Sequence, residues 1–133
     1  MRSVESGRVK QILVLEDDEL FAGSFAQSLS SRIAANVMMV NDPVKALRMV
    51  DSLKIDLLVA DMHLGARNSM TLLNEMASYP DTLELPKIIL SSSGDNLSLD
   101  DLRRYGVSAV YDKKTYNFDD LVTKVRELLG DGS

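Results

Sequence analysis

Apolar and polar residues follow two alternating patterns along this chain. Short, nearly continuous apolar runs indicate buried strands, and between them apolar residues recur at the three- and four-residue spacing of helices. The predicted strands cover residues 11–16, 37–40, 55–61, 87–91 and 107–111. Because strands and helices alternate, the pattern predicts one α/β domain in which helices flank a parallel sheet of five strands.

The first two helical stretches begin with polar residues suited to helix starts. The first covers residues 18–31, and we assign its apolar face to Leu20, Phe21, Ser24, Phe25 and Leu29. Asp42 and Pro43 supply an N-cap and a first-turn proline for the second helix. The apolar residues of that second helix are Val44, Leu47, Val50 and Leu53.

Three further helices complete the expected set of five. The third carries Met70, Leu72, Leu73 and Met76. After it, Pro80 and Pro86 bracket a connection that cannot be helical throughout. The fourth spans residues 97–105 and stops at Gly106, and the fifth begins after Asn117 as its cap.

Composition narrows the class of protein. A length of 133 residues suits a single domain, which we place at residues 9–129, between a polar lead-in (1–8) and a polar tail (130–133). The net charge of −5 argues against a nucleic-acid surface, and no apolar stretch approaches a membrane span. The chain has no cysteine, so it has no disulfides or thiolate sites and is expected in the cytoplasm.

Acidic residues end two of the predicted strands. Glu16, Asp17 and Asp18 follow the first strand, and Asp61 ends the third. In open α/β sheets the ligand crevice lies at the carboxyl ends of the strands, so these carboxylates should converge there. They would repel one another unless a hard cation lay between them, and Mg²⁺ prefers oxygen ligands. This predicts a metal beside an aspartate, with room for a phosphoryl group.

Two more residues extend this set along the same rim. Ser91 follows the fourth strand, thirty residues after Asp61, and Lys113 follows the fifth strand, fifty-two residues after Asp61. With this acidic pair, aspartate, serine and lysine at these intervals, the chain resembles the receiver domain of two-component response regulators from residue 9 to about residue 129. The resemblance implies a flavodoxin-like, doubly wound sheet in the order 2-1-3-4-5.

The resemblance also implies a role for each residue. Asp61 would accept a phosphoryl group from a phosphohistidine on a sensor histidine kinase or phosphotransfer protein. Asp17, the Asp61 carboxylate and the backbone carbonyl of His63 would bind Mg²⁺, or Mn²⁺ as a substitute, with Glu16 acting mostly through water. Ser91 and Lys113 would contact phosphoryl oxygens. Output would pass to an effector protein, or to an effector domain outside this sequence.

The chemistry supports these roles independently. A carboxylate that attacks a phosphoryl group brings negative charge onto negative charge, so catalysis depends on positioning and on neutralisation by a divalent ion and a lysine. The product adds about 1.5 to 2 negative charges at one strand end, which can bias a bistable element. Such a chain catalyses its own phosphorylation and slow dephosphorylation, and is not a conventional enzyme.

Ordinary structural explanations exist for several of these residues. Asp18 fits best as a helix cap rather than a ligand. Ser91 could simply satisfy backbone groups at a strand end. Of the adjacent lysines Lys113 and Lys114, only one can lie at the site.

The chain departs from the pattern of the family at four positions. Gly65 stands where proline is usual and Ala66 where glycine is usual, which suggests a loop of different stiffness. Lys114 replaces the proline that commonly follows the lysine, so we expect either an altered loop or a rare non-proline cis peptide. Val110 replaces an aromatic residue that rotates inward on activation in many members, and Tyr111 should point to the opposite side of the strand.

Other functions compete with a phosphorylated receiver. A phosphate-independent pseudo-receiver, acting as an adaptor through protein contacts, would accommodate Val110 and Lys114. A metal-dependent phosphatase would need a second acid two residues after Asp61, where this chain has His63. A flavin-binding domain would need a phosphate-cradling loop after the first strand, where acidic residues stand instead.

Overall fold

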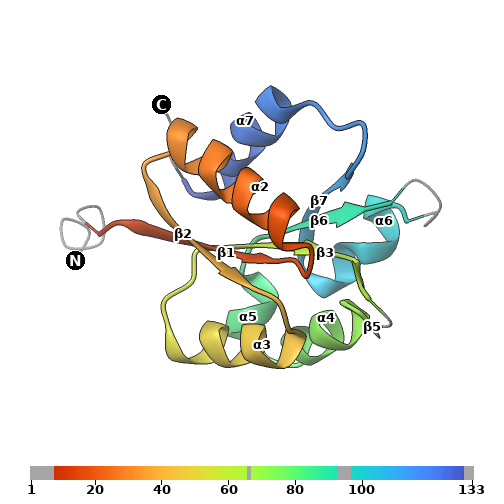
Figure 1. Ribbon diagram of the computed structural model, residues 1–133. Coiled ribbons are helices and arrows are strands. Elements are labelled where there is room, and N and C mark those ends of the chain that lie inside the picture. The colour runs from red at the N-terminus through yellow and green to blue at the C-terminus, as the bar shows by residue number, and fades with distance from the viewer. Residues whose placement is uncertain (1–7, 66, 93–96, 131–133) are drawn as a thin grey trace.

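A parallel sheet of five strands forms the centre of the protein in the computed structural model, which describes residues 8–65, 67–92 and 97–130 (Figure 1). Its strands are β1 (Lys10–Leu15), β2 (Ala35–Val40), β3 (Leu57–Asp61), β6 (Lys87–Ser91) and β7 (Val107–Asp112). They lie in the order β2-β1-β3-β6-β7. When these five are numbered by themselves the order is 2-1-3-4-5, so the predicted flavodoxin-like fold is confirmed.

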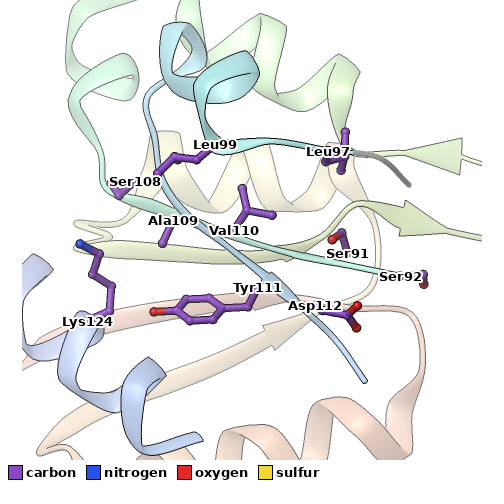
Figure 2. A pocket seen from close by; sticks show the side chains of 10 residues that line it. All are labelled: Ser91, Ser92, Leu97, Leu99, Ser108, Ala109, Val110, Tyr111, Asp112 and Lys124. Carbon is purple, nitrogen blue, oxygen red and sulfur yellow. The ribbon is translucent and has the colours of Figure 1, made fainter. Parts of the chain in front are cut away.

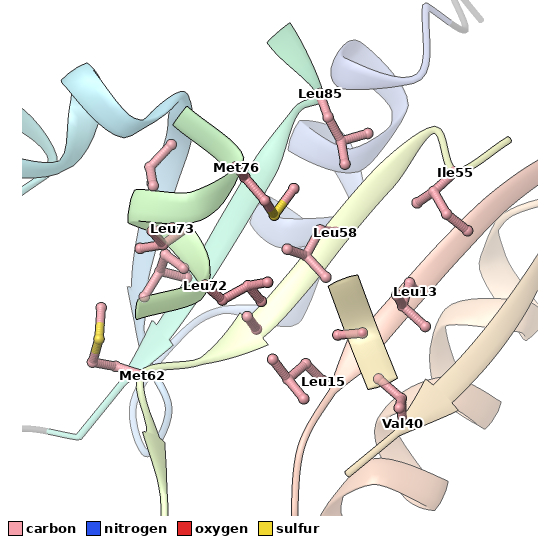
Figure 3. Close-up of a cluster of buried hydrophobic side chains, with 14 of the residues drawn as sticks. Leu13, Leu15, Val40, Ile55, Leu58, Met62, Leu72, Leu73, Met76 and Leu85 are labelled. Atoms are coloured by element: carbon pink, nitrogen blue, oxygen red, sulfur yellow. The ribbon is translucent and has the colours of Figure 1, made fainter. Parts of the chain in front are cut away.

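Helices cover both faces of the sheet. Two helices, α2 (Glu19–Arg32) and α7 (Phe118–Leu128), lie on one face, and α3 (Pro43–Ser52), α4 (Met70–Ala77) and α5 (Pro80–Glu84) lie on the other (Figure 1). The side chains of each strand alternate between two apolar cores. Leu13, Leu58 and Leu73 belong to the core under α3 and α4 (Figure 3). Ile12 and Val59 face the core of α2 and α7.

The predicted helix caps and the predicted stop at Gly106 are confirmed, whereas the fourth helix begins at Leu99, two residues later than predicted. Asp18 precedes α2 and accepts a hydrogen bond from the backbone nitrogen of Phe21 at 3.1 Å, which makes it the N-cap. Asp42 caps α3 and Asn117 caps α7 in the same way. The fourth helical stretch is α6 (Leu99–Leu102) followed by a 3₁₀ turn, η1 (Arg103–Tyr105), and Gly106 ends it with a φ of +83°.

Two predicted apolar faces were wrong in part. Leu20 is 87% exposed, and Ser24 is exposed as well. The stripe that α2 buries consists of Ala22, Phe25, Ala26 and Leu29. These positions follow the i, i+3, i+4, i+7 spacing, and Leu20 lies outside that stripe. Of the face predicted for the second helix, Val44 in α3 and Leu53 just after it are exposed.

The structure has six α-helices in its described residues, one more than predicted. The additional helix is α5, and Pro80 stands in its first turn, where a missing N–H costs nothing. A small hairpin, β4 (His63–Leu64) and β5 (Arg67–Asn68), follows β3 directly. Gly65 lies in its turn with a φ of +63°, a backbone conformation that proline cannot adopt. Glycine therefore suits this turn, and Ala66, the next departure from the family pattern, lies outside the residues that the structure describes.

Candidate functional site

The carboxyl ends of the strands bring the predicted site residues to one rim of the sheet. Glu16 follows β1, Asp61 ends β3, Ser91 ends β6 and Lys113 follows β7. Glu16, Asp61 and Ser91 are each less than 10% exposed, although all three are polar. Buried polar residues are retained where they are paired or functional, so this rim is the candidate site.

Lys113 connects two of these acids. Its Nζ lies 2.7 Å from Asp61 Oδ2 and 2.7 Å from Glu16 Oε1. Burial alone would lower the pKa of Lys113, but its close contacts with the Asp61 and Glu16 carboxylates outweigh burial and raise that pKa. The ammonium is therefore held charged between two carboxylates, and it is placed to neutralise negative charge that develops at Asp61.

Glu16 is the more deeply enclosed carboxylate. Burial raises its pKa, against the opposing effects of Lys113 and of the Asp18 amide. Glu16 Oε2 accepts a hydrogen bond from the backbone nitrogen of Asp18 at 2.9 Å. Among the described residues, none donates a well-aligned hydrogen bond to Glu16 Oε1, so its contact with Lys113 is an ion pair. This buried oxygen has unused capacity to accept a hydrogen bond from water.

The segment after β3 fixes the orientation of Asp61. The backbone nitrogen of His63 donates to Asp61 Oδ1 at 3.1 Å. Behind it, the buried hydroxyl of Ser69 donates to the backbone oxygen of Asp61 at 2.6 Å. Both oxygens of the Asp61 carboxylate therefore have a donor, one from Lys113 and one from His63, which leaves the side chain little freedom to rotate.

The residues present fit a magnesium ion in their chemistry. In the described residues, no group of three acidic, histidine or cysteine side chains is arranged to hold a metal. A Mg²⁺ site needs less, because one or two carboxylates with water molecules suffice. Asp17 Oδ2 lies 3.5 Å from the position that a Cβ atom on Gly65 would occupy, so Asp17 borders the loop after Asp61. The unused oxygen of Glu16 suits a water-mediated contact.

The loop after β7 places Lys113 through its backbone. The nitrogen of Lys113 donates to the oxygen of Ser91 at 2.7 Å, which joins the ends of β6 and β7. No peptide bond in the described ranges is cis, so the non-proline cis peptide expected as one alternative for Lys114 is not present there. Asp112 forms that turn by accepting from the nitrogen of Lys114 at 2.8 Å, and Lys114 is exposed.

Beside the site, an open groove lies along the edge strand β7 (Figure 2). Its volume is about 530 Å³, and Leu97, Leu99 and Val110 contribute its apolar residues on the side of α6. Tyr111 packs toward α7 instead, as the alternation of strand side chains predicts. Leu102 is buried in the core, whereas Leu97 and Leu99 are half-buried.

Two contacts at the rim were not predicted from the sequence. Lys113 Nζ lies over the ring of Phe21, 4.4 Å from its centroid. Arg67 on β5 forms an ion pair with Asp42 at 2.6 Å, which links the hairpin to the start of α3. The only sequence signal for Phe21 was helical spacing, and that spacing gave no indication of a lysine over its ring.

With this geometry described, comparison with known proteins identifies the family. The family model described as the response regulator receiver domain matches residues 12–126, so this chain belongs to that family and is a receiver domain of two-component signalling. It is also 28% identical over 101 residues to the Regulator of RpoS of Escherichia coli strain K12. That match covers 76% of this chain and 29% of the relative, so the chain spans less than a third of that protein.

Solved structures share the fold. The receiver domain of the Francisella response regulator 1452 superimposes with a TM-score of 0.78 at 19% identity, covering 93% of this chain and 99% of that one. The receiver domain of the sensor histidine kinase PA1611 of Pseudomonas aeruginosa PAO1 has a TM-score of 0.77 at 19% identity, covering 92% and 99%. That structure contains a magnesium ion coordinated in its active-site cleft.

In the described part of this chain, no helix is long and apolar enough to cross a membrane.

Proposed function

We propose that this receiver accepts a phosphoryl group on Asp61 from a phosphohistidine of a sensor histidine kinase or a phosphotransfer protein. The observation that carries the proposal is the ammonium of Lys113, held 2.7 Å from both Asp61 and Glu16. A lysine between two buried carboxylates is positioned to stabilise the charge of a phosphoryl group joined to one of them.

The step requires no other nucleophile. An oxygen of Asp61 forms a bond to phosphorus while the bond from phosphorus to the histidine nitrogen breaks, and that nitrogen keeps the electron pair and takes up a proton. Lys113 keeps its own proton and contacts a phosphoryl oxygen. The hydroxyl of Ser91, at the end of β6, donates a hydrogen bond to another phosphoryl oxygen. Slow attack by water on the phosphoryl group then releases inorganic phosphate and returns the Asp61 carboxylate.

A divalent ion would complete the charge balance. Asp17, Asp61 and the backbone carbonyl of His63 would hold Mg²⁺, with Mn²⁺ as a substitute, and Glu16 would act through a bound water molecule. When bound, the ion neutralises phosphoryl oxygens as charge develops on them. The magnesium ion in the PA1611 receiver supports this proposal by similarity.

The response would leave the site through the loop after β6. Because Val110 replaces the aromatic residue, a large ring rotation within β7 cannot occur, and the groove beside Val110 remains open. Movement of Ser91 toward the phosphoryl group would be passed to β7 through the hydrogen bond from Lys113 to the Ser91 carbonyl. An effector protein, or an effector domain outside this sequence, would read the face formed by α6, β7 and α7.

Incubation with acetyl phosphate and Mg²⁺ tests the proposal, with intact mass and peptide mapping as the measurements. We expect one acid-stable, base-labile phosphoryl group on Asp61 in the wild type and none in Asp61→Asn. Lys113→Ala should be severely impaired, and the exposed neighbour Lys114→Ala should behave as wild type. Labelling that survives Asp61→Asn, or that proceeds in excess chelator, would refute this mechanism. A wild type that is never labelled would favour the phosphate-independent adaptor.

A further inference from the structure

Phe21 is the third neighbour of the Lys113 ammonium, beside the two carboxylates. The centroid of its ring lies 4.4 Å from Lys113 Nζ, well within the range of about 6 Å over which an aromatic face attracts a cation. The Lys113 side chain is only 19% exposed, so water screens this contact weakly. The ammonium therefore has a carboxylate on two sides and an aromatic face on another.

The ring of Phe21 is itself held in place. Its backbone nitrogen is bound by the Asp18 cap at the start of α2. The ring stacks on Phe25 with a centroid distance of 5.7 Å and an interplanar angle of 17°. Phe25, which is buried, meets Phe118 of α7 edge to face at 6.3 Å. Phe21 and Phe25 of α2 thus form the surface on which Lys113 rests, and Phe118 borders that surface through Phe25.

The surface formed by Phe21 matters because the Lys113 ammonium contacts two carboxylates, whereas phosphoryl transfer needs it beside Asp61. Lysine side chains are flexible, and an ammonium shared by Glu16 and Asp61 could move toward either carboxylate. The face of Phe21 cannot form an ion pair and so favours neither acid, yet it limits how far the ammonium can turn away from both. The ring also excludes water from the charged cluster, which strengthens the electrostatic contacts within it.

We propose that Phe21 is a positioning residue that holds the Lys113 ammonium in place for phosphoryl transfer to Asp61. The proposal rests on the function proposed above for Asp61 and Lys113. In the step, the bond from an Asp61 oxygen to phosphorus forms as the bond to the leaving group breaks, and Phe21 contacts no reacting atom. Its effect passes entirely through the position of Lys113.

The test compares Phe21→Leu with Phe21→Tyr and Phe21→Trp, which keep an aromatic face, and with Phe118→Leu as the matched control. Phe118→Leu removes a ring from the same aromatic cluster, but the only cation over its ring in the described contacts is Arg32. With acetyl phosphate and Mg²⁺, we expect Phe21→Leu to be labelled about five- to tenfold more slowly than wild type. The aromatic variants and Phe118→Leu should stay within about twofold of wild type.

A second measurement is independent of phosphorylation. The ε-methylene protons of Lys113, assigned with the Lys113→Arg variant, should resonate upfield in the wild type because they lie over the ring, and should lose this shift in Phe21→Leu. An unshifted Lys113 signal in the wild type, or equal slowing by Phe21→Leu and Phe118→Leu, would overturn the proposal. If the shift is present but wild-type Asp61 is never labelled, the failure belongs to the proposed phosphoacceptor function and not to the contact.

Discussion

Two lysines are enclosed at opposite ends of the sheet, and their partners differ in kind. Lys113, at the carboxyl ends of the strands, lies between the side chains of Glu16 and Asp61. Lys87, at the start of β6, is 0% exposed and donates to the backbone oxygens of Thr82, Leu83 and Leu85 at 2.7–3.1 Å. Carboxylates can change charge when they are protonated or phosphorylated, whereas backbone carbonyls cannot.

The partners of the two lysines distinguish an end of the sheet with a purely structural role from an end whose contacts depend on carboxylate charge. Burial lowers the pKa of Lys87 to about 8, because no carboxylate among the described residues compensates for the lost hydration. At the other end the carboxylates raise the pKa of Lys113 in spite of its burial. We therefore expect the amino end of the sheet to stay the same when the protein is phosphorylated, and a change of charge to alter the contacts at the carboxyl end.

The largest effect on stability is expected from Lys87→Met. Methionine fills most of the space of the lysine but leaves three buried carbonyls without their donor, which should cost about 3 kcal/mol in the free energy of unfolding. Urea denaturation measures this change, with the exposed Lys114→Met as the control. Labelling of Asp61 should persist in the folded fraction of Lys87→Met. A loss of labelling there would mean that the two ends of the sheet are not independent.

A somewhat smaller effect is expected from Gly106→Ala at the same end. A Cβ atom at this position would lie 2.2 Å from the backbone oxygen of Leu83 and 2.6 Å from Lys87 Nζ, and the φ of +83° disfavours any side chain. We expect a loss of about 2–3 kcal/mol. Gly23→Ala in α2 is the matched control. Beyond the backbone of its own helix, a Cβ atom at Gly23 would meet none of the described residues within 4 Å, so this substitution should stabilise the protein by about 0.5–1 kcal/mol. Equal effects of the two substitutions would contradict the crowding around Lys87.

The third of these effects is a dependence on pH. The pKa of Lys87 falls from 10.5 to about 8 on folding, so between these values the unfolded chain binds more protons than the folded one. Stability contributed by this group should therefore rise with pH across that window, by about 3 kcal/mol, and stay level below pH 8. Urea denaturation of wild type and Lys87→Met at several pH values isolates the contribution. Parallel curves for the two proteins would show that Lys87 remains charged throughout.

The sequence predicted most of the rim and little of what supports it. Glu16, Asp61, Ser91 and Lys113 were predictable because strand ends of a parallel sheet must meet at one edge. Lys87 was assigned to a strand, but nothing in the pattern indicated a buried ammonium. Its partners are backbone groups in and just after α5, a helix that was not predicted because Pro80 indicated a break in helical structure. The place of Phe21 over Lys113 depends on how α2 packs beside the loop after β7, which periodicity along one helix does not encode.

The central claim is that phosphorylation of Asp61 changes the carboxyl end of the sheet and leaves the amino end as it is. Amide hydrogen exchange with and without beryllofluoride and Mg²⁺ tests it most directly, because each end has its own reporters. The Met62 amide donates to Leu90 and the Lys113 amide to Ser91 at the carboxyl end, whereas the Leu58 amide donates to Pro86 and the Gly106 amide to Arg103 at the amino end.

We expect the exchange rates of the Met62 and Lys113 amides to change on addition of beryllofluoride and Mg²⁺, together with those of residues 110 and 111 near the carboxyl end of β7. The Leu58 and Gly106 amides should exchange as before, and Asp61→Asn should show no change at either end. Changes confined to residues 16–18, or changes of equal size at both ends of the sheet, would contradict the account.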